Sequence, residues 1–503
     1  MEPEPKLGTS IAGLPSSSFT GTFEHACIFF IAVGVSVGFT AILAAVNYFS
    51  QTLFHDRLEF LYLCCAVYLP SLPVVVLQLK FDSDIDRRVG SRFSYAARAA
   101  VYFVAMGLIM IYLPLGPASA LDQHGPTWRR QPPLLISVTC LGFFSALAYG
   151  TFFQIVSFLP SKKGTCTAVF SMGYQGAGII VMVMAILIHF RTNPSELQVK
   201  AFFWGAGILE FWAGFCYIML HSRSLVFERA LSERDQEASV YISRVSSRTR
   251  VTSSTDPMRM TANAERNGES IWLNNPDLRS TRRNTSEDLK SRNASRKGSH
   301  SGEPRGLQPY TTNTLGKPVE DVGFDSELDL EDEDMSRDWK IFYKVAPCVL
   351  AIFLNIFASV FLLPFYTFFP AIDTWGKLPQ VLFFTKLVSD TVGRPVTLVL
   401  PPMRSQMSLF IFALGRVLIL IVFFANILGF ISWSPAFTVF MVAVFSGASG
   451  FVGTSCYQLA PSLVKSSFQK SQVANLLNFS FHFAVAVALL VSTGVSVCIN
   501  HRI

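Results

Sequence analysis

Residues 383–394 read FFTKLVSDTVGR and lie within an apolar run, residues 378–400, that is long enough to cross a bilayer. The run carries three charged side chains, Lys386, Asp390 and Arg394, spaced four residues apart. On a helix this spacing keeps the charges near one face. Because charge in hydrocarbon is unfavourable, that face should contact protein or water, which indicates a solute or ion path. The alternative is a structural ion pair, with Arg394 reaching toward the membrane surface.

The composition is that of a membrane protein. The chain of 503 residues is 51% hydrophobic and only 15% charged, whereas soluble domains are about 25% charged. The net charge of +7 is therefore no sign of a nucleic-acid partner, since much of the basic excess lies in loops, where it reports membrane orientation. The nine cysteines form no Cys-x-x-Cys pair, so neither a disulfide framework nor a metal site is predicted.

Apolar runs predict six membrane spans, a long hydrophilic segment and then five further spans. The runs cover residues 26–54, 61–79, 95–115, 134–159, 165–190 and 201–220, and then 341–369, 378–400, 409–431, 437–459 and 473–499. The first run is too long for the core of a signal peptide and is taken as a span. The predicted fold class is an all-α polytopic membrane protein with about 11 transmembrane helices in a 6+5, two-bundle arrangement.

Four parts follow from this pattern. Residues 1–22 are predicted to be a disordered tail, 23–221 an N-terminal bundle, 222–340 a disordered loop and 341–503 a C-terminal bundle. The loop contains RRNTS at 282–286 and RKGS at 296–299, which are candidate substrates for cytosolic kinases, although an ordinary solvated linker is the alternative. The Lys/Arg bias of the loops places the N-terminus and this loop in the cytosol and the C-terminus outside.

Several motifs follow one another through the membrane part. They are FLP at 158–160 with SMGYQGAG at 171–178, DTVGR at 390–394, Arg416 with Asn426, and SGASG at 446–450. Together with the six-plus-five order of spans, they resemble the equilibrative nucleoside transporter family, whose eighth helix carries Asp-x-x-Gly-Arg. The resemblance implies a major-facilitator-like fold in the plasma membrane and transport of nucleosides or nucleobases without a cofactor.

The same resemblance implies the site residues. Arg394 would donate hydrogen bonds to sugar hydroxyls, and Asp390 would orient Arg394. Phe39 and Tyr149 stand where the family has a Trp and a Gln that contact substrate, and both could offer a stacking face to a base. Lys386 and Arg416 are expected to act as gate residues or ion-pair partners. The departures at Phe39, at Tyr149 and at Leu387, which stands where the family has an Asn and has Lys386 beside it, leave the identity of the solute open.

Other classes of function fit the sequence less well. The sequence lacks a G-x-x-x-x-G-K-[ST] phosphate-binding loop, and the expected mechanism needs no covalent chemistry, so an enzyme is not predicted. The alternatives are a two-bundle transporter of a different small polar solute, and a non-transporting scaffold or receptor. The expected partners are a small-molecule substrate, the lipid bilayer and cytosolic kinases, with no nucleic acid.

Overall fold

The computed structural model describes residues 20–45, 48–49, 59–118, 131–161, 164–190, 194–237, 337–368, 378–400, 403 and 405–500. Within these residues every regular element is a helix, and ten helical segments are long and apolar enough to cross a membrane. The chain is thus a polytopic all-α membrane protein, as the hydropathy pattern predicts. The predicted tail up to Phe19 and most of the predicted loop lie outside the described residues.

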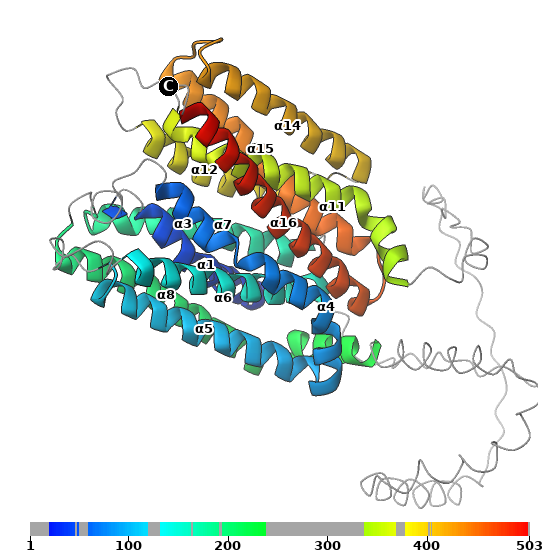
Figure 1. The fold of residues 1–503 in the computed structure, drawn as a ribbon. Coiled ribbons are helices and arrows are strands. Elements are labelled where there is room, and N and C mark those ends of the chain that lie inside the picture. Colours follow the sequence, from blue (N-terminus) through cyan, green and yellow to red (C-terminus); the bar gives the residue numbers. More distant parts are fainter. Residues whose placement is uncertain are drawn as a thin grey trace, which may run out of the picture. The chain divides into compact units, whose positions relative to one another are not determined.

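The N-terminal half is built around its first helix. Helix α1 (Thr22–Ala44) packs against α6 (Gln131–Phe158), α7 (Thr165–Leu187) and α8 (Glu196–Arg223), while α5 (Ser91–Leu115) covers α6 and α8. The second span is interrupted: α3 (Glu59–Tyr68) ends before Pro70, and α4 (Ser71–Val89) follows it. A proline cannot donate the backbone hydrogen bond that a continuous helix needs, which explains the break. These helices form one group in Figure 1.

The C-terminal half forms a second group of helices (Figure 1). Helix α11 (Arg337–Phe361) continues into a short 3-10 helix (Leu363–Phe368) and packs against α14 (Gln406–Ile427), α15 (Pro435–Ser462) and α16 (Ser467–Asn500). Helix α12 (Leu378–Gly393) packs on α15, and a four-residue helix, α13 (Val396–Val399), follows it. The run around the three charges, expected to be one continuous span, is therefore divided into two helices next to Pro395, and neither is among the ten helices long enough to cross a membrane.

Helix α12 and helix α15 approach so closely that only glycine fits between them. A Cβ atom on Gly393 would lie 2.0 Å from the carbonyl oxygen of Gly447, and one on Gly450 would lie 2.2 Å from the carbonyl oxygen of Asp390. Small residues allow helix backbones to meet in this way inside a membrane. Gly393 of α12 and Gly450 of the SGASG motif thus set the distance between the charged helix and its neighbour.

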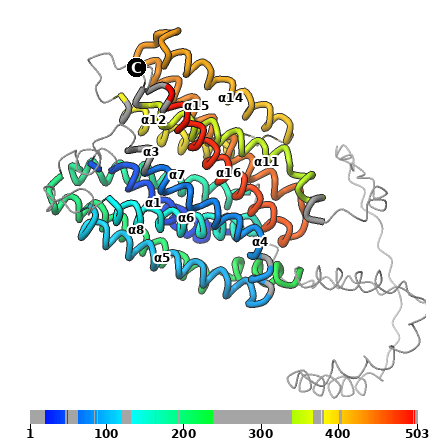
Figure 2. The backbone as a smooth tube through the Cα atoms, in the orientation of Figure 1, coloured from blue at the N-terminus to red at the C-terminus, as the bar shows by residue number. Residues whose placement is uncertain are grey.

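The two halves meet along several helices. Helix α16 contacts α3, α4 and α6, while α7 contacts α12 and α15. In the tube view of Figure 2, α16 runs beside α3 and α4 from the other half. Segments more than 200 residues apart in the sequence are thereby brought together, which positions side chains of both halves around one space.

Two sequence-based boundaries are corrected. The first apolar run was expected to span to Phe54, but α1 ends at Ala44. Two aromatic residues that follow α1 in this apolar run, Tyr48 and Phe49, pack inside the protein, where both are buried. The Tyr48 hydroxyl donates a hydrogen bond to the Ala118 carbonyl at 2.9 Å.

The predicted disordered loop was expected to begin at residue 222, but residues 225–237 are helical. These residues form an amphipathic helix, in which the apolar side chains of Phe227, Ala230 and Leu231 are buried. The segment is hydrophilic on average, so its composition alone did not predict the helix. Arg234 on the same helix is buried against charged partners described below. The ordered part of the chain therefore extends to Glu237.

Candidate functional site

A cavity lies between the two halves of the chain. Helices α1, α3, α6 and α7 line it from one side, and α11, α12, α15 and α16 from the other. Five of the six site residues expected from the sequence line this cavity, and the sixth, Arg416, does not. The five are Phe39, Tyr149, Lys386, Asp390 and Arg394. Residues that are 355 positions apart in the chain are thus gathered in one place.

Asp390 and Arg394 form the ion pair that their one-turn spacing suggests. Arg394 Nη2 lies 3.2 Å from Asp390 Oδ2, and both side chains are largely buried. Arg394 Nη1 also donates to the carbonyl oxygen of Ser171 on α7, at 3.2 Å. A single guanidinium therefore joins the charged helix of one half to a helix of the other. The second carboxylate oxygen, Asp390 Oδ1, accepts no hydrogen bond from any described residue.

Aromatic rings from both halves form a further part of the cavity wall. The Phe39 ring centroid lies 5.9 Å from that of Tyr174 and 6.1 Å from that of Tyr68. Tyr149 lies 4.7 Å from Tyr174 and 5.3 Å from Phe481 of α16, measured between ring centroids. The Tyr149 hydroxyl donates to the Tyr457 hydroxyl at 3.4 Å. The wall thus presents several π faces and a pair of phenols, which suits a flat ring system.

Arg416 lies behind the cavity wall rather than in it. Its Nη1 donates to the carbonyl and the side-chain oxygen of Asn355 on α11, and its Nη2 donates to Ser359 Oγ at 2.9 Å. Its guanidinium carbon lies 4.3 Å from the Phe445 ring centroid. An ion pair was one expected role for Arg416, but within the described residues no carboxylate lies within 4.0 Å of it. Arg416 instead fixes α11 against α14.

Lys386 lines the cavity and makes no ion pair. Asp390, one turn away on the same helix, is bound by Arg394, and no other carboxylate of the described chain lies within 4.0 Å of the Lys386 ammonium. An ion pair, the other role expected for Lys386, is therefore absent within the described residues. Its expected role as a gate residue stays a prediction.

Sequence reasoning missed a polar group on the C-terminal wall of the cavity. Asn355 Nδ2 donates to the Ser449 carbonyl at 3.2 Å, and the Ser359 and Ser449 hydroxyls are 2.8 Å apart. All three residues line the cavity. An available signal was the isolated Asn355 within an otherwise apolar run of α11, because a polar side chain inside a span usually faces protein or a cavity.

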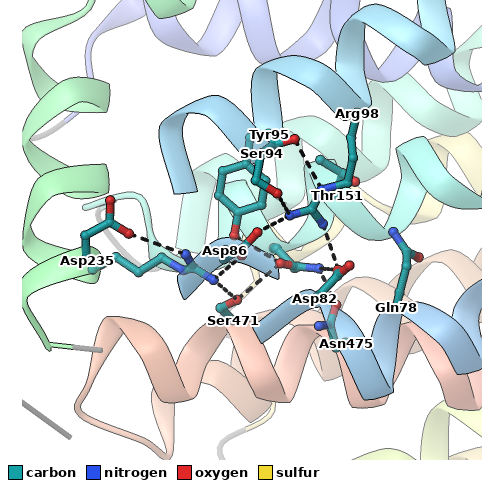
Figure 3. A network of polar contacts seen from close by, with 12 residues as sticks. Gln78, Asp82, Asp86, Ser94, Tyr95, Arg98, Thr151, Asp235, Ser471 and Asn475 are labelled. Carbon is teal, nitrogen blue, oxygen red and sulfur yellow. Dashed lines mark hydrogen bonds and ion pairs between the residues drawn. The ribbon is translucent and has the colours of Figure 1, made fainter. Parts of the chain in front are cut away.

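A second set of polar contacts was also missed; we call it the polar network (Figure 3). It comprises Asp82, Asp86, Tyr95, Arg98, Gln154, Arg234, Ser471 and Asn475. Arg98 of α5 forms ion pairs with both aspartates of α4, and its Nη1 lies 2.8 Å from Asp82 Oδ2. Arg234 pairs with the second aspartate, since its Nη2 lies 2.7 Å from Asp86 Oδ2. These ion pairs stay within the N-terminal half and the helix that follows it.

The polar network also crosses to the C-terminal half through α16. Gln154 Nε2 donates to Asn475 Oδ1 and to Asp82 Oδ2, each at 2.6 Å. Arg234 Nη2 donates to Ser471 Oγ at 3.3 Å, and Ser471 donates to Gln154 Oε1 at 3.3 Å. Several hydrogen bonds therefore hold α6 and the helix of residues 225–237 to α16. The sequence feature that could have predicted this network is the set of charged residues at the ends of predicted spans, namely Asp82, Asp86 and Arg98.

The fold is that of a known class of membrane protein. Among solved structures, the chain is similar to the major facilitator superfamily proton:xylose symporter XylE bound to 6-bromo-6-deoxy-D-glucose. The TM-score is 0.54 at 12% sequence identity, over 93% of this chain and 87% of that one. The chain thus has a major-facilitator-like, two-bundle fold, as predicted. At this identity the likeness shows the fold alone, and the resemblance to equilibrative nucleoside transporters stays a prediction.

The sequence itself gives no closer identification. No protein-family model matches it, and no curated protein matches it significantly.

Proposed function

We propose that this protein moves a small solute across a membrane by alternating access, and that the solute is a nucleoside or a nucleobase. One observation carries the proposal: a single cavity is lined by both halves of the chain and combines an ion pair with an aromatic wall. Transporters built from two bundles bind solutes at such a place and rock the bundles around it.

The cavity offers two kinds of contact. A base would stack on the faces of Phe39, Tyr149 and Tyr174, while a sugar hydroxyl would accept a hydrogen bond from Arg394. Asp390 holds the Arg394 guanidinium in place through the ion pair, so that Arg394 needs little reorganisation to bind solute. The site therefore binds and releases without covalent chemistry, and no cofactor takes part.

Alternating access requires contacts between the halves to form and break. In the proposed cycle the polar network separates at α16 and the Arg394 contact to Ser171 is lost when the halves rotate. Hydrogen bonds serve this purpose well because water replaces them at modest net cost. The solute would then reach the side of the membrane on which the polar network lies.

The orientation in the membrane is also proposed. The Lys/Arg bias puts the N-terminus and the loop after Glu237 in the cytosol and the C-terminus outside, in the plasma membrane. Antibody labelling of an epitope at Ile503 in intact cells tests this. Labelling only after permeabilisation would place the C-terminus inside and overturn the orientation.

Uptake of radiolabelled uridine, adenosine, uracil and adenine into cells that lack their own carriers tests the function. We expect saturable uptake of at least one of them, and loss of uptake in Asp390→Asn at equal surface expression. The competing candidates are a two-bundle transporter of a different small polar solute and a non-transporting scaffold or receptor. Absence of uptake and of binding for all four probes would favour these candidates instead.

A further inference from the structure

Positive charge around the cavity exceeds negative charge. Lys386 and Arg394 line the cavity, and Arg416 lies directly behind Asn355 and Ser359 of its wall. Asp390 is the one carboxylate among the described residues that line the cavity. Three cationic side chains thus surround a single anionic one.

The contacts leave most of this charge unbalanced. Asp390 is committed to Arg394, at 3.2 Å. Arg416 contacts neutral groups, namely Asn355, Ser359 and the Phe445 ring. Lys386 makes no hydrogen bond or ion pair to any described residue. Two positive charges therefore lack an anionic partner inside the part of the membrane domain that the structure describes.

Such an excess is unfavourable in a membrane interior unless an anion enters. Clefts lined by one sign of charge also raise the local concentration of ligands of the opposite sign. The ammonium of Lys386 is the group with donors to spare, since it has three N–H donors and none is used by the protein. The partner that the cavity lacks is therefore an anion placed next to Lys386.

We infer that the solute of this cavity is a planar aromatic anion, whose carboxylate or equivalent acidic group binds Lys386 while its ring stacks on Phe39 and Tyr174. The inference rests on the proposed function and names the class of its substrate. Neutral nucleosides and nucleobases would share the site at lower affinity, because they leave the charge of Lys386 unbalanced. Acidic nucleobases and other heteroaromatic carboxylates belong to this class.

Pairs of probes that differ in charge but hardly in shape test the inference. The full-length protein is reconstituted in liposomes, and binding and uptake are compared for nicotinate with nicotinamide and for orotate with uracil. We expect the anionic member of at least one pair to bind about tenfold or more tightly, which corresponds to about 1.4 kcal/mol. Uptake of the anion should also quicken when the liposome interior is made positive.

Substitutions at Lys386 test whether this residue causes the preference for the anionic probe. Lys386→Gln should abolish the preference for the anion, whereas Lys386→Arg should retain it. Because Lys386→Gln removes an unpaired charge, its melting temperature should not fall, which separates a lost solute contact from a damaged fold. The matched control is Lys200→Gln on α8, where the lysine is already paired with Glu196 outside the cavity; it should leave the preference unchanged.

Three results would overturn the inference. One is equal binding of anionic and neutral probes with no effect of Lys386→Gln. Another is tight binding of the neutral probes that disappears when gluconate replaces chloride, because then an inorganic anion balances Lys386. The third is an uptake rate of the anion that is indifferent to membrane potential and to Lys386→Gln. If no aromatic probe of either charge is bound, and Asp390→Asn behaves as the parent protein does, the proposed function itself fails.

Discussion

Arg394 links the two halves of the molecule: its Nη2 lies 3.2 Å from Asp390 Oδ2 on its own helix, and its Nη1 donates to the Ser171 carbonyl of α7 at 3.2 Å. The pair is therefore both an intrahelical ion pair and a contact between bundles. Any motion that separates α7 from α12 must break the second contact, while the first persists. This arrangement makes the contacts of Arg394 depend on the relative position of the two halves.

Removing either charge of this pair should be costly. Asp390→Asn leaves Arg394 without its carboxylate, and Arg394→Gln leaves Asp390 without its cation. Breaking a buried pair by removing one partner costs about 3–5 kcal/mol. We expect each variant to lower the melting temperature in detergent and to lose uptake, as measured by size-exclusion stability assays and by transport.

Exchanging the two charges separates a structural role from solute binding. In the double variant Asp390→Arg with Arg394→Asp, the pair is retained but the cation moves by one turn, about 6 Å along the helix. We expect expression and thermal stability to recover while uptake stays lost. Full recovery of uptake in the exchanged protein would contradict direct binding of solute by Arg394.

The sequence predicts the site best where charge lies inside an apolar run. Lys386, Asp390 and Arg394 stand out because hydrocarbon excludes charge, so their position alone indicates a cavity or a partner. Phe39 and Tyr149 came from the resemblance to a family, since aromatic residues are too common in spans to be informative by themselves. The structure brings all five to one cavity.

Other parts of the site could not be read from the sequence. The role of Arg416 depends on which residue of α11 faces it, and that register is set by packing between helices 61 positions apart. The helix of residues 225–237 was missed because its sequence is largely hydrophilic. The partners of its buried Arg234, among them Asp86, Ser471 and the ring of Tyr95, are distant in the chain. Hydropathy patterns indicate the secondary structure and burial of a local segment, but they do not identify contacts between residues that are distant in the chain.

Glycines of the α12–α15 contact give a prediction about packing. Gly393→Ala and Gly450→Ala each place a Cβ atom about 2 Å from a backbone oxygen of the neighbouring helix, namely that of Gly447 and of Asp390. Overpacking of this kind typically costs about 1–3 kcal/mol and moves the backbone. We expect lower melting temperatures and reduced uptake, because α12 carries the charges of the cavity.

Two other glycines serve as controls for that experiment. A Cβ on Gly447 would meet nothing nearer than the Ser389 carbonyl at 3.5 Å, and one on Gly415 would meet nothing within 4 Å. Gly447→Ala and Gly415→Ala should therefore leave the melting temperature unchanged or raise it slightly, since alanine favours helix. Equal damage in all four variants would argue against the close approach of α12 and α15.

The corrected loop boundary predicts where a deletion is tolerated. Removal of residues 241–333 should leave the membrane domain folded, because this segment has few apolar residues and no sustained periodicity. Removal of residues 225–237 should destabilise it, because Phe227 and Leu231 are buried and Arg234 pairs with Asp86. Size-exclusion profiles in detergent of the two deletions decide this, and the reverse order of stability would show the boundary to be wrong.

The last prediction is that the polar network keeps the cavity closed on one side of the membrane. Arg234→Ala removes the ion pair to Asp86 and the hydrogen bond to Ser471, while Asp86 keeps Arg98 as a partner. The fold should therefore survive, but the conformation in which α16 is held to the N-terminal half loses stabilisation. A loss of about 1.4 kcal/mol would shift the ratio of closed to open forms tenfold.

A cysteine in the cavity reports that shift. In a background without the nine native cysteines, Gly453→Cys places a thiol in the cavity lining at a position with room for it, since the nearest atom to its Cβ is Asn355 Nδ2 at 3.5 Å. We expect a water-soluble maleimide to label this thiol several-fold faster in Arg234→Ala than in the parent.

The matched control is Arg92→Ala, which breaks an ion pair to Glu228 on the same short helix; because both side chains are more than half exposed, that pair contributes little. Arg92→Ala should label at the parent rate. Equal labelling in all three proteins would mean that the polar network does not close the cavity, and that Arg234 only anchors the helix of residues 225–237 to the membrane domain.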